Sequence, residues 1–353
     1  MMADGKKVLV TGATGYVASW IVKRLLEEGH HVHATARNIS QKNKTTHLQK
    51  LADESPGEIS FFEADLLQEG AFEKAMKDCE IVFHTASPFI TVVKDAQKDL
   101  IDPALLGTRN VLEQAKATPS VQRVVLTSSC AAMYTDAIDC QKGPNGELDE
   151  SIWNDTASLD YQPYNYSKTL AEKAAWEIAD TQDQWKLVTI NPSLIFGPAL
   201  APEFSKSESL AIFKQLADGS LSTGVPRVGI GISDIRDAAE AHYQAGFKPN
   251  ASGRNIVSGH NTNMLEMARL VHEKFGDQYK VPHSLAPKWL LYLVGPMVNK
   301  VITWKFVKNN VDVEWKANNS KSIKELGITY RPLEETLSDT FEQAIQQGIV
   351  KPK

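Results

Sequence analysis

The sequence of 353 residues has few cysteines, no long uninterrupted apolar segment and no internal repeat. Its cysteines are Cys79, Cys130 and Cys140, an odd number without the spacing of metal ligands. This usage argues against a disulfide framework or a cysteine-bound metal and is typical of reduced thiols in the cytoplasm. The first ten residues also lack an apolar run behind a basic start, so they do not indicate export. We therefore expect a cytoplasmic protein that holds no metal.

Charge of one sign is not in large excess. The chain carries 38 Lys and Arg against 43 Asp and Glu, a net charge of −5 at pH 7. This balance provides no overall attraction to nucleic acid or to an anionic membrane. The hydrophobic fraction of 42% and the charged fraction of 23% are those of an ordinary soluble globular chain. We expect a small-molecule partner, and either a monomer or a homodimer.

The most apolar stretch is WLLYLVGPMVNKVITW at residues 289–304. Gly295 and Pro296 interrupt it and Lys300 lies inside it, so it falls short of the roughly 20 apolar residues that a membrane-spanning helix requires. The pattern favours two short helices that cover a pocket over an interfacial membrane anchor.

A strand, a glycine turn and a helix are indicated at residues 6–20, KKVLVTGATGYVASW. The β-branched run ends at Gly12, which permits backbone angles that a side chain forbids, and Gly15 allows a phosphate close to the main chain. Ala18 keeps the first helical turn slim. The helix N-terminus would then present free N–H groups and partial positive charge to a pyrophosphate. Strand-to-helix turns also need glycine for purely structural reasons, so this pattern requires support from the rest of the chain.

The second predicted strand, residues 31–36, ends beside cations. A dinucleotide-binding fold meets the adenosine ribose at this point, where a carboxylate would favour NAD. Here Arg37 follows the strand and Lys42 and Lys44 come soon after, which favours the 2′-phosphate of NADP(H). The alternative is a solvated basic surface.

Strands alternating with helices continue over about 130 residues, which predicts an α/β fold with a Rossmann-type doubly wound parallel sheet. The third strand is expected at 59–63. Asp65 and Leu66 follow it and suit an adenine ring, although Asp65 could instead cap the next helix. Further strands are expected at 80–84, 121–127, 186–190, 228–230 and 255–257, and helices at 103–116, 164–178, 209–217, 234–247, 265–275 and 333–347. The region 136–160 is predicted to be a long surface loop.

No low-complexity linker divides the chain, so the second lobe should be interwoven with the first. We expect residues 1–190 to form the cofactor-binding domain, with a returning segment near 225–258. Residues 191–224 and 259–353 would form a smaller substrate-binding lobe.

Three residues indicate a reaction. Tyr164 and Lys168 are four apart and share a helix face. An ammonium beside a phenol lowers the pKa of the phenol, which then can give a proton to a carbonyl oxygen near neutral pH. Ser129, at the end of the fifth strand, can hydrogen-bond the same oxygen as charge develops there. A Tyr and a Lys at this spacing occur often by chance, so the argument depends on their coincidence with the glycine turn.

Together these motifs resemble the extended short-chain dehydrogenase/reductases, in particular the group of dihydroflavonol 4-reductases, cinnamoyl-CoA reductases and methylglyoxal or aldehyde reductases. The motifs are Thr11-Gly12-x-x-Gly15-x-x-Ala18, Asp65-Leu66, His84-Thr85-Ala86-Ser87-Pro88, Thr127-Ser128-Ser129, Tyr164-x-x-x-Lys168, Asn191-Pro192, Gly197-Pro198, Asp234-Ile235-Arg236-Asp237 with His242, and Arg331-Pro332-Leu333. The resemblance covers nearly the whole chain. It implies an NADPH-dependent reductase of aldehydes or ketones, or the reverse alcohol oxidation.

The resemblance also implies roles for single residues. The pyrophosphate would be held by Gly12, Gly15, Tyr16 and Val17, and the 2′-phosphate by Arg37 and Lys44. Asp65 and Leu66 would contact the adenine. Ala86 and Ser87 would line the cofactor, and Pro192 to Ile195 would fix the nicotinamide. Lys168 would also hold the nicotinamide ribose. The pocket candidates are Ser87, Phe89, Cys130, Met133, Tyr134, Phe204 and the 289–304 stretch, an apolar set that suits a hydrophobic or aryl carbonyl compound. Met133 and the tryptophan stretch equally suit plain core.

The sequence departs from the family pattern in two places. The asparagine that completes a catalytic tetrad in many short-chain reductases has no counterpart near residues 100–104. The NWYCYGK run of cinnamoyl-CoA reductases is also absent, which counts against a CoA thioester.

A nucleotide-sugar epimerase or dehydratase on the same fold is an alternative function, but such enzymes usually favour NAD. A non-catalytic NADP(H) sensor is another, but such proteins tend to lose the Tyr or the Lys.

Overall fold

The computed structural model describes residues 5–87, 93–202, 208–221, 224–298 and 302–353. Its largest element is a seven-stranded, wholly parallel sheet with the order β3-β2-β1-β4-β5-β6-β9. The strands are β1 (Lys7–Thr11), β2 (His31–Ala36), β3 (Glu58–Glu63), β4 (Ile81–His84), β5 (Arg123–Thr127), β6 (Lys186–Pro192) and β9 (Gly253–Val257). The order reverses between β1 and β4. A ligand crevice is expected at that point, outside the carboxyl ends of the strands.

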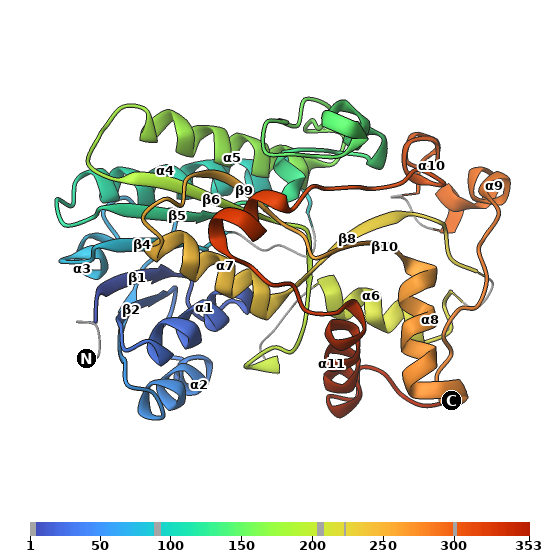
Figure 1. Ribbon diagram of the computed structural model, residues 1–353, viewed down its shortest axis with the longest axis horizontal. Helices are drawn as coiled ribbons and strands as arrows, with labels where there is room; N and C mark the ends of the chain where they lie inside the picture. Colours follow the sequence, from blue (N-terminus) through green and yellow to red (C-terminus); the bar gives the residue numbers. More distant parts are fainter. Residues whose placement is uncertain (1–4, 88–92, 203–207, 222–223, 299–301) are drawn as a thin grey trace.

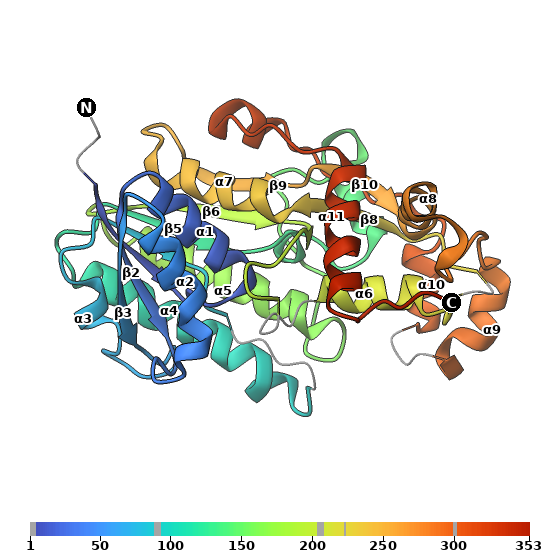
Figure 2. The same cartoon turned by 90° about the horizontal axis from the view of Figure 1, so that it is seen from below.

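Helices cover both faces of this sheet, as Figures 1 and 2 show. On one face, α1 (Tyr16–Glu27), α2 (Lys42–Asp53) and α7 (Ile235–Phe247) bury apolar side chains against the strands. On the other face, α3 (Glu73–Met76), α4 (Asp102–Lys116) and α5 (Pro163–Ala179) form a second core layer. The strand sequences are nearly continuous apolar runs because both of their faces are covered. The expected Rossmann-type α/β fold is therefore confirmed.

A smaller sheet of three strands forms the second lobe. Its strands are β7 (Leu194–Phe196), β8 (Gly229–Asp234) and β10 (His260–Asn263), and β8 lies between a parallel β7 and an antiparallel β10. The apolar core beside it comes from α6 (Glu208–Ala217), α8 (Met264–Phe275) and α11 (Leu333–Gln346). The segment 225–258, expected to return to the first domain, is divided between the two sheets. Strand β9 pairs in the large sheet and α7 packs on it, whereas β8 pairs in the small sheet.

The expected long loop contains only short 3₁₀ turns in the structure, among them Ala137–Lys142 and Pro144–Gly146. Helix α2, by contrast, was not indicated by the sequence pattern, because its run KNKTTHLQKLAD contains few apolar residues. Only a few of its side chains, such as Leu48 and Ala52, reach the core.

The apolar stretch near the C-terminus forms two short helices, α9 (Lys288–Val298) and α10 (Trp304–Asn310). Among the residues described, no helix is long and apolar enough to cross a membrane. The expectation that these helices cover a pocket is wrong for their most apolar face, because Trp289, Leu293 and Met297 are exposed to solvent.

Candidate active site

The glycine turn between β1 and α1 is shaped as a phosphate site requires. Gly12 has a φ of 63°, in the left-handed region, and a Cβ there would lie 3.1 Å from the Cβ of Ala86. Gly15 is the N-cap of α1 and has no capping side chain, so the first N–H groups of the helix are not covered by a side-chain oxygen. These features fit a dinucleotide whose pyrophosphate lies over the turn.

Tyr16 and Val17 open α1 at this turn. The hydroxyl of Tyr16 donates to the carbonyl oxygen of Gly197 at 2.6 Å, and burial raises the pKa of this phenol. The side chain therefore ties α1 to the turn that follows β7, and leaves only the backbone N–H of Tyr16 for a phosphate.

The hydroxyl of Thr11 joins β1 to β4 at the strand ends. Its Oγ1 accepts hydrogen bonds from the backbone N–H groups of Thr85 and Ala86, at 3.1 and 3.0 Å, and lies 2.9 Å from Nδ1 of His84. Burial lowers the pKa of His84 to about 3, so its imidazole is neutral. Sequence reasoning missed this role of Thr11, although its position as the last residue of a strand was a usable signal.

The predicted adenosine contacts lie at the ends of β2 and β3. Arg37 directly follows β2 and Lys44 lies in the first turn of α2, and both are exposed. Asp65 does not cap a helix: its Oδ1 accepts from the N–H of Leu67 at 2.8 Å, in a local turn after β3. Leu66 is partly buried next to it.

Tyr164 and Lys168 lie on one face of α5, as expected. The helix begins at Pro163, after Gln162 with a φ of 55°, so Tyr164 stands in its first turn and is 49% exposed. Nζ of Lys168 lies 6.0 Å from the centroid of the Tyr164 ring. The helix thus presents a phenol and a cation together at the carboxyl edge of the sheet.

Ser129 follows β5 and caps the short turn Cys130–Ala132, against which α5 packs. Its Oγ accepts from the N–H of Ala131 at 3.1 Å and donates to the carbonyl oxygen of Pro192 at 3.4 Å. The latter bond is long and replaceable, so the hydroxyl can turn to a substrate oxygen. Pro192 ends β6 and Ile195 lies on β7, so the expected nicotinamide contacts border the same edge.

A narrow pocket lies at this edge of the sheet and has Lys168 in its wall. Its wall includes His84, Ala86, Ser87, Thr108, Thr127, Ser128, Lys168 and Glu172. Loss of solvent lowers the pKa of Lys168 to about 8, while the charge of Glu172 opposes that shift. The ammonium of Lys168 is therefore poised to exchange a proton near the pH at which enzymes work.

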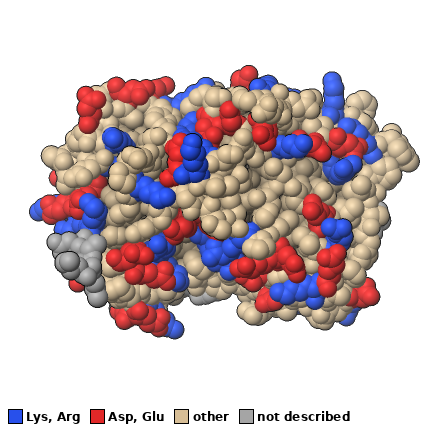
Figure 3. All heavy atoms as spheres, in the orientation of Figure 1, with Lys and Arg blue, Asp and Glu red and all other residues tan. Residues whose placement is uncertain are grey.

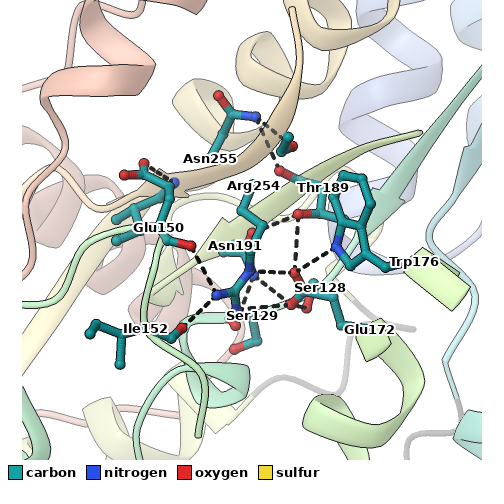
Figure 4. A network of polar contacts seen from close by, with 12 residues as sticks. Ser128, Ser129, Glu150, Ile152, Glu172, Trp176, Thr189, Asn191, Arg254 and Asn255 are labelled. Carbon is teal, nitrogen blue, oxygen red and sulfur yellow. Dashed lines mark hydrogen bonds and ion pairs between the residues drawn. The ribbon is translucent and has the colours of Figure 1, made fainter. Parts of the chain in front are cut away.

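Glu172 is a candidate positioning residue that sequence reasoning did not identify. It lies one turn beyond Lys168 on α5, is only 1% exposed, and sits at the centre of the network in Figure 4. Its carboxylate accepts from Ser128 Oγ (2.5 Å), Arg254 Nε (2.7 Å), Asn191 Nδ2 (2.8 Å), Thr189 Oγ1 (3.2 Å) and Trp176 Nε1 (3.5 Å). The usable signal was an acidic residue four positions after Lys168, on the helix face that Tyr164 and Lys168 share.

Arg254, on β9, is the ionic partner of Glu172 and is 7% exposed. Its Nη1 donates to the carbonyl oxygens of Glu150 and Ile152, and its guanidinium lies 3.9 Å from the ring centroid of Trp153. The pair therefore links α5, β6 and β9 to the long loop that precedes α5.

The predicted substrate residues divide into three groups. Cys130 and Met133 are buried in a core cluster with Trp315, so their environment favours packing over substrate contact. Ser87 is exposed at the end of β4. Phe89 and Phe204 lie outside the residues that the structure describes.

Comparison with known proteins identifies relatives over nearly the whole chain. Residues 8–259 match the NAD dependent epimerase/dehydratase family. The chain is 36% identical to cinnamoyl-CoA reductase CAD2 of Medicago truncatula, over 96% of this chain and 95% of that protein. It is 36% identical to an anthocyanidin reductase of Vitis vinifera, over 79% and 83% of the two chains. The crystal structure of yeast methylglyoxal/isovaleraldehyde reductase Gre2 complexed with NADPH superposes with a TM-score of 0.78 at 30% identity, covering 98% of this chain and all of that one.

The buried pair yields a stability prediction. We expect Glu172→Gln to lower the free energy of unfolding by about 3–5 kcal/mol, because the charge of Arg254 would remain buried without a partner. The matched control is Glu177→Gln on the same helix, which breaks only an exposed ion pair with Arg109 and should change stability by at most about 1 kcal/mol. Urea denaturation of both variants measures the difference. Equal losses would contradict the central role of the pair.

Proposed function

The chain belongs to the NAD dependent epimerase/dehydratase family, within the extended short-chain dehydrogenase/reductases, and from that premise we propose that it is an NADPH-dependent reductase of aldehydes or ketones. The observation that carries the proposal is the placement of Tyr164 and Lys168 on one face of α5, beside Ser129 and the glycine turn. The same arrangement allows the reverse oxidation of an alcohol.

The cofactor is NADP(H), which the yeast reductase Gre2 also binds in its crystal structure. When bound, it supplies the hydride that reaches the carbonyl carbon. Gly12, Gly15 and the N-terminus of α1 would hold the pyrophosphate, and Asp65 and Leu66 would border the adenine; the open helix N-terminus and the positive φ of Gly12 support this. Arg37 and Lys44 pair with the 2′-phosphate by charge.

Side chains of the protein carry out the proton transfer. The hydroxyl of Tyr164 gives its proton to the substrate oxygen, so that the carbonyl becomes an alcohol. The ammonium of Lys168 stabilises the phenolate that remains. Ser129 donates a hydrogen bond to the same oxygen while negative charge develops on it.

The substrate is an apolar or aromatic carbonyl compound. Two relatives carry the names of aromatic substrates, cinnamoyl-CoA and anthocyanidin. The missing NWYCYGK run argues against the CoA thioester and in favour of a free aldehyde or ketone. Retention of both Tyr164 and Lys168 argues against a purely sensory protein, and the cations at Arg37 and Lys44 argue against an NAD-dependent epimerase.

Removal of the proton donor tests the proposal directly. We expect Tyr164→Phe to lower kcat for reduction by roughly 10²–10⁴-fold while NADPH binding is retained, because general acid catalysis contributes about that factor. Tyr166→Phe, on another face of α5, is the control and should stay close to wild type. The measurement is NADPH oxidation with a panel of aldehydes and ketones. Activity of Tyr164→Phe within a few-fold of wild type would refute the assignment.

Cofactor choice tests the two cations. We expect the double variant Arg37→Glu, Lys44→Glu to bind NADPH roughly 10–100-fold more weakly, because it loses charge-assisted hydrogen bonds to the 2′-phosphate, and to bind NADH with little change. Lys50→Glu, at the other end of α2, is the control. Fluorescence titration with each nucleotide measures the ratio. A preserved preference for NADPH would exclude this role.

The pH profile tests the electrostatics of Lys168. Its pKa of about 8 predicts that kcat/KM for reduction falls as the pH rises through that value, because the ammonium becomes neutral. The negative charge of Glu172 raises this pKa, so Glu172→Gln should move the falling limb to lower pH. Glu177→Gln should leave it in place. An unchanged limb in Glu172→Gln would show that the limb does not report Lys168.

A further inference from the structure

Helix α9 carries an apolar stripe that faces solvent. Trp289, Leu293 and Met297 follow each other at four-residue spacing and are 64%, 64% and 86% exposed. The opposite side of the helix is anchored by Leu291, which packs with Val307 in a small core cluster. The stripe therefore lies on the outer side of a firmly attached helix.

The stripe continues onto α10 and the segment before α9. Trp304 is 68% exposed and its ring lies 6.4 Å from that of Tyr292, at 85°. Leu285 and Val294 are also exposed. We call Leu285, Trp289, Leu293, Val294, Met297 and Trp304 the α9–α10 patch. Monomeric soluble proteins rarely expose so many large apolar side chains together, and such patches usually mark an interaction site.

The sequence of the two helices carries lysines and no acidic residue. Between residues 286 and 311 the sequence contains four lysines and no Asp or Glu, although the whole chain has a net charge of −5. Lys305 and Lys308 are exposed on α10, beside the apolar surface. A local basic rim around an apolar face is complementary to a surface that is apolar inside and negative outside.

The position of the patch allows contact with a flat surface. Figures 1 and 2 both place α9 at the end of the molecule farthest from β2 and β3. Figure 3 shows uncharged atoms at the tip of that end, with acidic and basic side chains near them. Nζ of Lys305 lies 3.5 Å from the ring centroid of Tyr161, three residues before Tyr164. The patch is thus accessible and borders the catalytic helix.

We propose that the α9–α10 patch docks on the surface of an anionic lipid bilayer. The two tryptophans suit the interface between headgroups and acyl chains, and the lysines attract anionic headgroups. At 11 residues α9 is too short to span, so it lies in the plane of the interface, with its apolar side about 5–10 Å deep. A second copy of the chain is a poorer partner, because a two-fold contact would bring the lysines of both copies together.

Vesicle flotation with the full chain tests the proposal. We expect the protein to float with vesicles of phosphatidylcholine and phosphatidylserine, and much less with phosphatidylcholine alone or at high salt. The tryptophan emission should shift to shorter wavelength on binding. Absence of flotation with anionic vesicles would overturn the proposal.

Charge insertion locates the contact. We expect the double variant Leu293→Glu, Met297→Glu to bind anionic vesicles at least about tenfold more weakly, because two apolar side chains would no longer enter the interface. Leu106→Glu, on α4 and 51% exposed, is the matched control and should bind as wild type does. Circular dichroism confirms that each variant is folded. Equal binding by all three proteins would exclude the patch.

A separate measurement addresses the second copy. Light scattering of the wild type and of the double variant, without lipid, reports their mass. A monomer in both cases agrees with the lipid proposal. A wild-type dimer that the double variant converts to monomer would assign the patch to self-association and overturn the proposal.

Discussion

The position of α5 against the large sheet depends on the buried ion pair between Glu172 and Arg254. Two charges taken out of water are tolerated only when their hydrogen-bonding groups are satisfied, and here the carboxylate accepts from five side chains. Satisfying them requires α5, β6 and β9 to lie in one arrangement (Figure 4). The position of α5, and with it the position of Tyr164, follows from that requirement.

Three residues at four-residue spacing on helix α5 lie in three different environments. Tyr164, Lys168 and Glu172 are spaced by four residues, so they share a face and lie progressively deeper: an exposed phenol, an ammonium in a pocket wall and a buried carboxylate. Burial lowers the pKa of Lys168 and the nearby carboxylate limits that shift. The helix thus connects the exposed Tyr164 to the buried network that fixes its position.

Much of the fold was predictable because both faces of the large sheet are buried and its strands are therefore apolar runs bounded by turns. The strand ends near Gly12, Ser129 and Pro192 lie at one edge because the strands are parallel. Helix α2 was missed because few of its side chains contact the core. The burial of Cys130 and Met133 could not be read from their local sequence, since it depends on Trp315, almost 200 residues away.

The sequence by itself determined the alternation of strands and helices, the glycine turn, the cations after the second strand and the spacing of Tyr164 and Lys168, because each depends on neighbouring residues and on local periodicity. Only the tertiary structure decided that Glu172 would face Arg254, 82 positions later, and that the apolar side chains of α9 would point to solvent. Both outcomes depend on which distant segments pack together. A hydrophobic residue has the same identity in a core and on a surface, and packing alone separates the two.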